Sequence, residues 1–221
     1  MAKAKTAFVC TECGADYSKW QGQCTACQAW NTISEVRGVS GPGKGARSAR
    51  FEGYAGSLSE VKSLDEVSLA EQARISTGMQ EFDRVLGGGL VEGSAVLMGG
   101  HPGASKSTLL LQAVCQLAEK HSALYVTGEE SLQQVAMRAK RLGLPTDQLR
   151  MLSETNVEAI CQQAQLLRPK VLVVDSIQVI HSEDISSAPG SVSQVRECAA
   201  FLTRFAKQTG TVLFLVGHVT K

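Results

Sequence analysis

The chain has 221 residues, of which 43% are hydrophobic and 19% charged, with 22 Lys and Arg residues against 21 Asp and Glu. This length suits one main domain with a small appendage, and the composition is that of a globular protein. The balanced charge excludes a global attraction for polyanions, so nucleic-acid contact must come from local patches. No apolar run approaches the ~20 residues of a membrane span, and the basic start lacks the apolar segment of a signal peptide. We expect a cytoplasmic protein without membrane contact, whose seven cysteines are reduced or metal-bound.

Residues 1–33 contain two C-x-x-C pairs separated by ten residues, Cys10 with Cys13 and Cys24 with Cys27. Each pair forms a tight knuckle whose thiolates point at one ion, and two knuckles complete the tetrahedron that Zn²⁺ prefers. Disulfides and redox-active pairs are the alternatives, but a cytoplasmic setting and the paired spacing argue against both. We predict a zinc-ribbon-like module in which these four cysteines hold a structural zinc, since four thiolates leave no open position for catalysis.

Two tryptophans, Trp20 and Trp30, flank the second knuckle. They could stack on nucleobases, but packing around the metal is the more common use of such rings, and the sequence favours packing. Residues 34–60 that follow are rich in Gly, Ser and Arg and show no hydrophobic period, which predicts a flexible linker. Its basic residues could contact phosphates, although solvation is the simpler interpretation.

Residues 61–221 alternate apolar runs of strand length with segments of helical period. This alternation predicts an α/β fold with a mostly parallel sheet covered on both faces. In such sheets ligands bind beyond the carboxyl ends of the strands, where every candidate residue named below lies. Strands are expected at 94–100, 123–128, 149–153, 170–175 and 211–218, and helices at 106–120, 131–144, 156–168 and 191–210.

The stretch GGHPGASKST, residues 99–108, matches the phosphate-loop pattern G-x-x-x-x-G-K-[ST] except that Ser105 replaces the second glycine. It follows an expected strand and opens an expected helix, which is the context that the pattern requires. Backbone N–H groups would surround the β-phosphate, Lys106 would bridge the β- and γ-phosphates, and Ser107 would hold Mg²⁺. The predicted nucleotide-binding residues are Gly100, His101, Pro102, Gly103, Ala104, Ser105, Lys106, Ser107, Thr108 and Asp175.

Three acidic residues and a histidine follow the neighbouring strands. Asp175 ends the run VLVVD, where it would hold Mg²⁺ or its water, the alternative being a helix cap. Glu129 and Glu130 end YVTGEE, and one of them would orient and deprotonate the attacking water, with Glu129 preferred. His218 ends LFLVGH and would sense the γ-phosphate or else serve as a structural histidine. We predict catalytic roles for Lys106, Glu129, Glu130 and His218, with ATP and Mg²⁺ as cofactors.

Taken together, these residues resemble the bacterial RadA (Sms) DNA-repair family of RecA-like ATPases over essentially the whole chain. The likeness rests on FVCTECGADYSKWQGQCTACQAWNT for the zinc motif and on STGMQEFDRVLGGGLVEGSAVLMGG, LYVTGEESLQQVAMRAKRLGL and VVDSIQ for the core. The resemblance implies a RecA-like core and an ATP-driven, helicase-like motor, stimulated by DNA, that processes or branch-migrates recombination intermediates. It also implies single-stranded or branched DNA as partner, a homo-oligomeric ring with ATP sites between subunits, and a recombinase partner. By the same resemblance residues 181–194 occupy the place of a DNA-facing loop, and their composition predicts a flexible segment that is not basic.

Two features depart from that family. Ser105 replaces the family's glycine, which costs about 1–2 kcal/mol if the position needs a positive φ and only some crowding if the backbone there is helical. The sequence also stops at Lys221, where members of that family continue into a Lys-Asn-Arg-Phe-Gly motif and a protease-like domain. Residues 61–221 are therefore expected to form a C-terminally truncated core. We predict an impaired ATPase. The alternatives are a regulatory ATPase of the same superfamily with a protein target, and a non-hydrolysing zinc and DNA adaptor.

Overall fold

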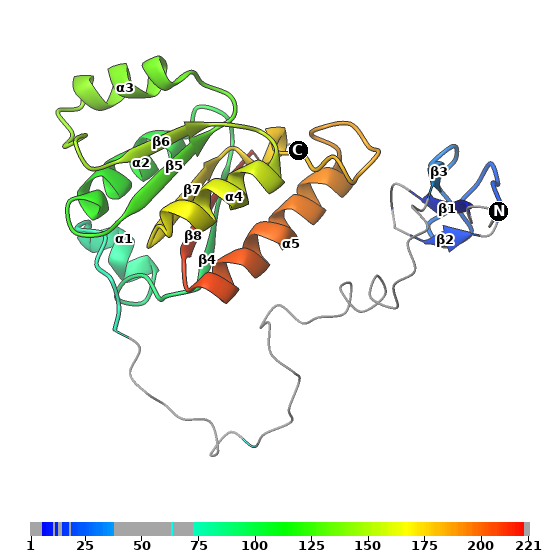
Figure 1. Cartoon of the computed structure of the whole chain (residues 1–221), viewed down its shortest axis with the longest axis horizontal. Coiled ribbons are helices and arrows are strands. Elements are labelled where there is room, and N and C mark those ends of the chain that lie inside the picture. Colours follow the sequence, from blue (N-terminus) through cyan, green and yellow to red (C-terminus); the bar gives the residue numbers. More distant parts are fainter. Residues whose placement is uncertain are drawn as a thin grey trace.

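The computed structural model describes residues 6–10, 12, 15–17, 19–37, 63 and 73–218. Cys13, most of the predicted linker and Lys221 lie outside the described residues. The described residues form a small three-stranded sheet near the N-terminus and a five-stranded α/β core (Figure 1). Within these residues no helix is both long enough and apolar enough to span a membrane.

An antiparallel sheet in the order β2–β1–β3 forms the N-terminal unit. Its buried core consists of Cys10, Cys24 and Ile33, which is too little apolar surface to hold a fold without a metal or another staple. The zinc module was predicted to end at residue 33, but β3 continues to Arg37, which pairs with Thr6 of β1. Strand pairing uses main-chain hydrogen bonds, so it can continue where the side chains show no hydrophobic period. The strands are β1 (Thr6–Cys10), β2 (Asp16–Tyr17) and β3 (Ile33–Arg37).

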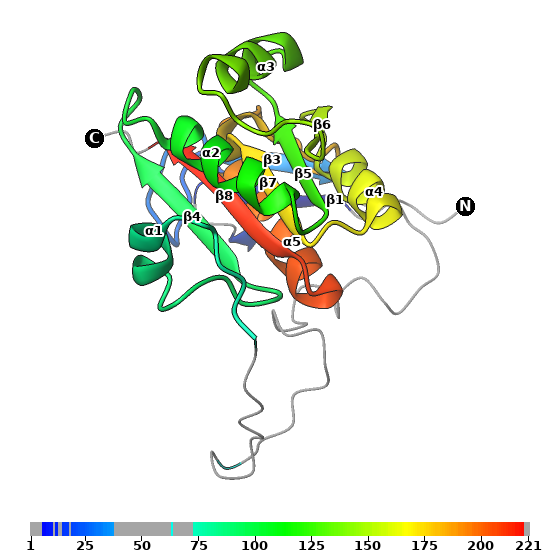
Figure 2. The same ribbon diagram turned by 90° about the vertical axis from the view of Figure 1, so that its left-hand side faces the viewer.

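A parallel sheet in the order β4–β8–β7–β5–β6 forms the core (Figure 2). Its three central strands are buried along almost their whole length, as continuous apolar runs predict for a parallel sheet covered on both faces. The edge strands β4 and β6 are only partly buried. The strands are β4 (Ala95–Gly100), β5 (Ala123–Thr127), β6 (Arg150–Ser153), β7 (Val171–Asp175) and β8 (Val212–His218).

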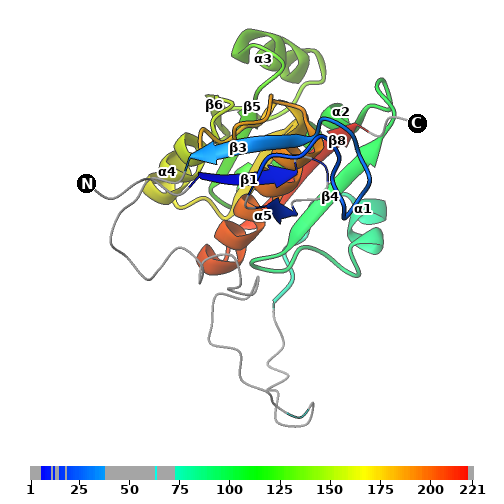
Figure 3. The same ribbon diagram turned by 90° about the vertical axis from the view of Figure 1, so that its right-hand side faces the viewer.

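Helices cover both faces of this sheet. Tyr125 and Phe214 pack with α1, α2 and α3, whereas Leu124 and Leu213 pack with α4 and α5 on the other face (Figure 3), because successive side chains of a strand point to opposite faces. The short helix α1 has no fully buried residue and was not predicted from the sequence. The helices are α1 (Gln80–Val85), α2 (Lys106–Ala118), α3 (Leu132–Arg141), α4 (Val157–Leu167), η2 (Ile177–Val179) and α5 (Val192–Thr209).

Side-chain caps determine where three of these helices begin. Ser131 before α3, Asn156 before α4 and Ser191 before α5 each accept a hydrogen bond from a backbone N–H in the first turn. Ser105 precedes α2 but its side chain makes no such bond. The amino end of α2 therefore differs from the other three, and it lies directly after the loop that the phosphate pattern singled out.

Candidate functional site

The loop between β4 and α2 places backbone N–H groups at the amino end of a helix. Residues 101–105 are exposed, and one turn within them is closed by the Ala104 N–H, which donates to the His101 carbonyl at 3.2 Å. Gly103 has φ 81° and Ser105 has φ 56° and ψ 19°. Position 105 thus adopts the left-handed conformation, the first of the two alternatives considered from the sequence. An uncapped helix N-terminus of this kind favours a bound anion, because its N–H groups and the helix dipole point toward it.

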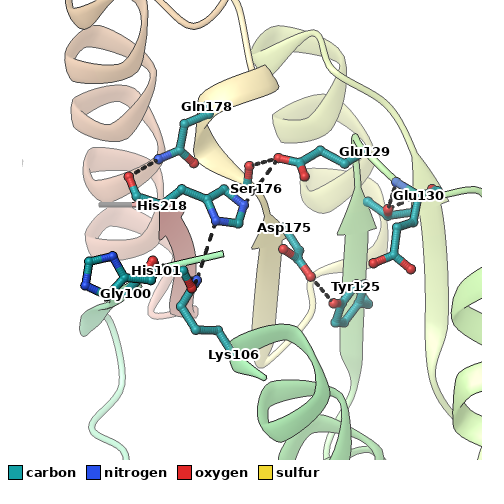
Figure 4. A network of polar contacts seen from close by, with 11 residues as sticks. Gly100, His101, Lys106, Tyr125, Glu129, Glu130, Asp175, Ser176, Gln178 and His218 are labelled. Carbon is teal, nitrogen blue, oxygen red and sulfur yellow. Dashed lines mark hydrogen bonds and ion pairs between the residues drawn. The ribbon is translucent and has the colours of Figure 1, made fainter. Parts of the chain in front are cut away.

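Lys106, the first residue of α2, reaches back over this loop. Its side chain is held by the carbonyl oxygens of Gly100 and His101, to which Nζ donates at 2.8 and 2.9 Å. The residue is only 8% exposed, and Nζ lies 3.5 Å from His218 Nδ1 (Figure 4). The ammonium group is therefore anchored at the mouth of the loop, where it can exchange a carbonyl for a phosphate oxygen with little movement.

Asp175 ends β7 and is oriented by a buried tyrosine. The Tyr125 hydroxyl, on β5, donates to Asp175 Oδ2 at 2.5 Å. Burial, followed by the nearby Asp175 carboxylate, raises the pKa of Tyr125, so this hydroxyl keeps its proton and remains a donor. The sequence did not identify Tyr125 as a site residue, although a tyrosine inside an otherwise apolar strand was a signal, since its hydroxyl needs a partner when buried.

The two glutamates that follow β5 point in different directions (Figure 4). Glu129 accepts a hydrogen bond from the Ser176 hydroxyl, and its Oε1 lies 3.7 Å from His218 Nε2. Glu130 instead pairs with Arg138 on α3, and this hydrogen bond raises the pKa of the Arg138 guanidinium. Glu129 therefore faces the phosphate loop, whereas Glu130 ties the strand end to α3.

His218, the last residue of β8, lies between the two candidate catalytic groups. Its Nδ1 is near Lys106 and its Nε2 is near Glu129, while Gln178 Nε2 donates to its carbonyl oxygen at 3.2 Å. The arrangement satisfies the geometric needs of both a sensor and a structural histidine. Because one ring nitrogen of His218 is near Lys106 and the other is near Glu129, a movement of Lys106 would alter the contact between His218 and the Glu129 carboxylate.

Ser107 and Thr108 lie in the first turn of α2 and are half-buried. Ser107 and Asp175 supply the hydroxyl and carboxylate oxygens that Mg²⁺ prefers. Asp175 ends β7, and α2 begins after the loop that follows β4, so both residues lie on the side of the sheet where its parallel strands end. The residues present therefore fit a nucleotide with its metal. Ser176 and Gln178 also belong to this site, and they were missed because their roles depend on partners 40 or more positions away.

The predicted zinc ligands converge in the N-terminal unit. The Sγ atoms of Cys10, Cys24 and Cys27 all lie within 4.8 Å of one another, and those of Cys10 and Cys27 are 3.7 Å apart. In a tetrahedral zinc site with Zn–S bonds of about 2.3 Å, two thiolate sulfurs lie about 3.8 Å from each other. Tyr17 and Thr32 hydroxyls lie 3.1 and 3.2 Å from two of these sulfurs, as the outer partners of a thiolate site do. The three cysteines fit zinc, and Cys13 remains the predicted fourth ligand.

Two expectations from the sequence are not met. Trp20 and Trp30 do not pack around the cysteine cluster, because they are 60% and 69% exposed. The segment 181–194 was expected to be a flexible loop, but buried Gln194 donates from Nε2 to the carbonyls of Ser182, Ile185 and Ser187 and holds it against α5. A glutamine amide that satisfies buried carbonyls is not visible as a sequence pattern.

Comparison with known proteins places these sites in context. Residues 62–221 match a family described as an AAA domain, and residues 8–35 match one described as a rubredoxin metal binding domain. Over its whole length the chain is 64% identical to the DNA repair protein RadA of Escherichia coli and 64% identical to that of Haemophilus influenzae. It is 47% identical to the DNA repair protein RadA of Bacillus subtilis. The chain spans about half the length of these relatives, 48% in each case.

Proposed function

The chain belongs to the AAA domain family, and from that premise we propose that it binds and hydrolyses ATP while acting on DNA in recombination and repair. One observation carries the proposal. Lys106, Asp175 and Glu129 come together where the parallel strands of the sheet end, beside a helix N-terminus that has no side-chain cap (Figure 4). Each of the three chemical tasks of phosphoryl transfer to water has a side chain there: charge neutralisation, metal binding and orientation of the nucleophile.

The roles follow from the contacts. The N–H groups of residues 103–107 would receive the β-phosphate, and Lys106 would turn from its two carbonyl partners to the phosphate oxygens. Ser107 and Asp175 would hold Mg²⁺, which supplies charge neutralisation when bound. Glu129 would accept the proton of a water molecule held on the γ-phosphate side.

Two hydrogen bonds position the carboxylates for these roles. Tyr125 fixes Asp175, and Ser176 fixes Glu129. His218 stands between Lys106 and Glu129, so loss of the γ-phosphate would change the surroundings of both ring nitrogens. We assign it the sensing role on this ground.

DNA and oligomeric partners extend the proposal. The three relatives bear the name DNA repair protein, which supports single-stranded or branched DNA as the ligand and DNA-stimulated, helicase-like hydrolysis. Residues 101–105 are exposed, and a neighbouring subunit in a homo-oligomeric ring would cover them and complete the nucleotide site. A recombinase is the protein partner that processing of recombination intermediates would require.

Phosphate release from Mg·ATP, with and without a single-stranded oligonucleotide, tests this proposal. We expect turnover that rises with the oligonucleotide and is lost in Lys106→Ala, while hydrolysis indifferent to DNA would favour a regulatory ATPase with a protein target. The left-handed Ser105 favours a second candidate, a non-hydrolysing adaptor whose nucleotide site is weak. A thermal midpoint that does not rise with millimolar ATP would support that adaptor, because a ligand of the native state stabilises it by mass action.

A further inference from the structure

Two tryptophan side chains form an exposed aromatic surface on the zinc module. Trp20 and Trp30 are 60% and 69% exposed. A Cβ atom at Gly22 would lie 3.9 Å from Trp20 Cη2 and also 3.9 Å from Trp30 Cζ3. The two rings therefore converge on one point of the backbone, from residues ten positions apart, and we call them the tryptophan pair.

The knuckle that carries the pair is folded by its backbone and by its cysteine. Cys24 N–H donates to the Ala29 carbonyl at 2.9 Å, and Asn31 N–H donates to the Gly22 carbonyl at 2.8 Å. Cys24 points inward and is fully buried. The buried cluster of the module is built from Cys10, Cys24 and Ile33 with Phe8, Ala15 and Tyr17. The tryptophan pair is outside that cluster, so folding of the module does not explain why two large rings are kept in solvent.

The side chains around the pair are polar. Lys19 is exposed beside Trp20. Asn31, next to Trp30, is also exposed, and its amide can donate and accept hydrogen bonds. Gln23 Nε2 is already used within the knuckle, where it donates to the Gln28 carbonyl at 2.9 Å. Among the described residues of the module, the large hydrophobic side chains that are exposed are the two tryptophans and no aliphatic residue. Protein-binding surfaces have an apolar centre larger than this, whereas aromatic rings beside an exposed amide and a lysine match the chemistry of a nucleobase and its phosphate.

The distribution of charge points to the same ligand. The first 50 residues contain seven Lys and Arg against three Asp and Glu, while residues 51–221 contain 15 Lys and Arg against 18 Asp and Glu. Residues 6–37, which carry the tryptophan pair, contain Lys19 and Arg37 against Glu12, Asp16 and Glu35. The excess of positive charge comes from the sequence on either side of the module, at Lys3, Lys5, Lys44, Arg47 and Arg50, which lie outside the described residues. Basic segments on both sides of the module in the sequence favour a polyanion there over the slightly acidic remainder of the chain.

We propose that Trp20 and Trp30 form a stacking site for the unpaired bases of a single nucleic-acid strand, with Lys19 beside its phosphates. Stacking needs free base faces, which a duplex does not offer except at its ends. The inference rests on the proposed function for its claim that the chain binds DNA, and it adds where unpaired bases are held and by which side chains. It gives the zinc module a binding role separate from the nucleotide site on the core.

The chain contains its own reporter for this site, because Trp20 and Trp30 are its only two tryptophans. Intrinsic tryptophan fluorescence of the zinc-loaded full chain therefore reports on the pair alone. We expect an oligo-dT strand to quench it in a saturable manner and a blunt duplex of equal length to quench it far less. Anisotropy of a labelled oligonucleotide gives total DNA binding in the same samples.

Variants separate stacking from folding. Trp20→Ala and Trp30→Ala should each weaken oligo-dT binding by about five- to a hundredfold, the usual effect of removing one stacking ring. Trp20→Phe and Trp30→Phe should retain most of the affinity because they keep a ring. Phe201→Ala, which removes an exposed aromatic side chain from α5, is the matched control and should change nothing. An unchanged zinc content shows that each variant module is folded.

The outcomes distinguish this proposal from the proposed function. Oligonucleotide binding by anisotropy without tryptophan quenching, and with wild-type affinity in both alanine variants, would overturn the stacking site and leave DNA binding by the core intact. No binding of any DNA would overturn both. A fluorescence change that depends on protein concentration or on added protein, and not on DNA, would identify the pair as a protein contact and also overturn the proposal.

Discussion

Replacing Ser105 by glycine should tighten nucleotide binding. Ser105 has φ 56° and ψ 19°, a left-handed conformation in which a Cβ costs about 1–2 kcal/mol and which glycine adopts without that cost. Residues 101–105 are exposed and one backbone hydrogen bond, from Ala104 N–H to the His101 carbonyl, closes a turn within them, so little packing holds the loop in this strained conformation. A loop that relaxes out of this conformation must regain it to bind phosphate, so we expect Kd for Mg·ATP to fall by up to about five- to thirtyfold in Ser105→Gly at 1.4 kcal/mol per decade.

Calorimetric titration with a non-hydrolysable ATP analogue measures this change, with Ser105→Ala as the matched control. Alanine keeps the Cβ and lacks the hydroxyl, so it should bind like the wild type. Glycine also increases the conformational entropy of the unfolded chain, which lowers the free energy of unfolding by about 0.4–1 kcal/mol. Strain relieved in the nucleotide-free loop raises the free energy of unfolding, so the two effects partly cancel. Thermal unfolding without nucleotide gives this second quantity and allows the two effects to be separated.

Two results would refute the reasoning about Ser105. Equal Kd values for the wild type and Ser105→Gly would show that the left-handed dihedral costs nothing on binding. A loss of affinity in Ser105→Ala would show that the hydroxyl contributes a hydrogen bond to phosphate, and that the serine is an adaptation of the loop and not a defect in it.

Two further predictions concern the metal sites. Tyr125→Phe removes the hydrogen bond to Asp175, so the Mg²⁺ concentration for half-maximal hydrolysis should rise about tenfold with little change in thermal midpoint, and an unchanged Mg²⁺ requirement would contradict the positioning role. Burial raises the pKa of Cys115, Cys161 and Cys198 to about 11, 12 and 11, so a colorimetric thiol reagent at pH 8 should react with four thiols after chelation and with these three only after denaturation. Chelation that exposed all the thiols together would show that the zinc module and the core do not unfold separately.

The sequence predicted the core because its signals are local. Runs such as VLVVD and LFLVGH, continuous in apolar residues and ending in a polar one, specify both a buried parallel strand and the place of its site residue. The same logic placed Lys106 at the start of a helix and Asp175 and Glu129 at strand ends, where the structure has them.

What could not be predicted depends on partners distant in the chain. The different surroundings of Glu129 and Glu130 come from Ser176 and Arg138, and neither pairing has a sequence spacing that reveals it. The conformation of Ser105 was open for a different reason: a serine does not report its own φ, and only the glycine of the general pattern suggested it. The exposure of the tryptophan pair was misjudged because a sequence does not show which side chains of a small zinc module enter its buried cluster.

Hydrolysis by Glu129→Gln and Glu130→Gln tests the central claim most directly, since both remove one negative charge from adjacent residues. Glu129 faces the phosphate loop, and Glu130 is paired with Arg138. The account predicts that Glu129→Gln binds ATP with wild-type affinity but releases phosphate about 10²–10⁴-fold more slowly, while Glu130→Gln retains turnover. Normal turnover in Glu129→Gln, with loss in Glu130→Gln, would contradict the assignment of the water-activating carboxylate.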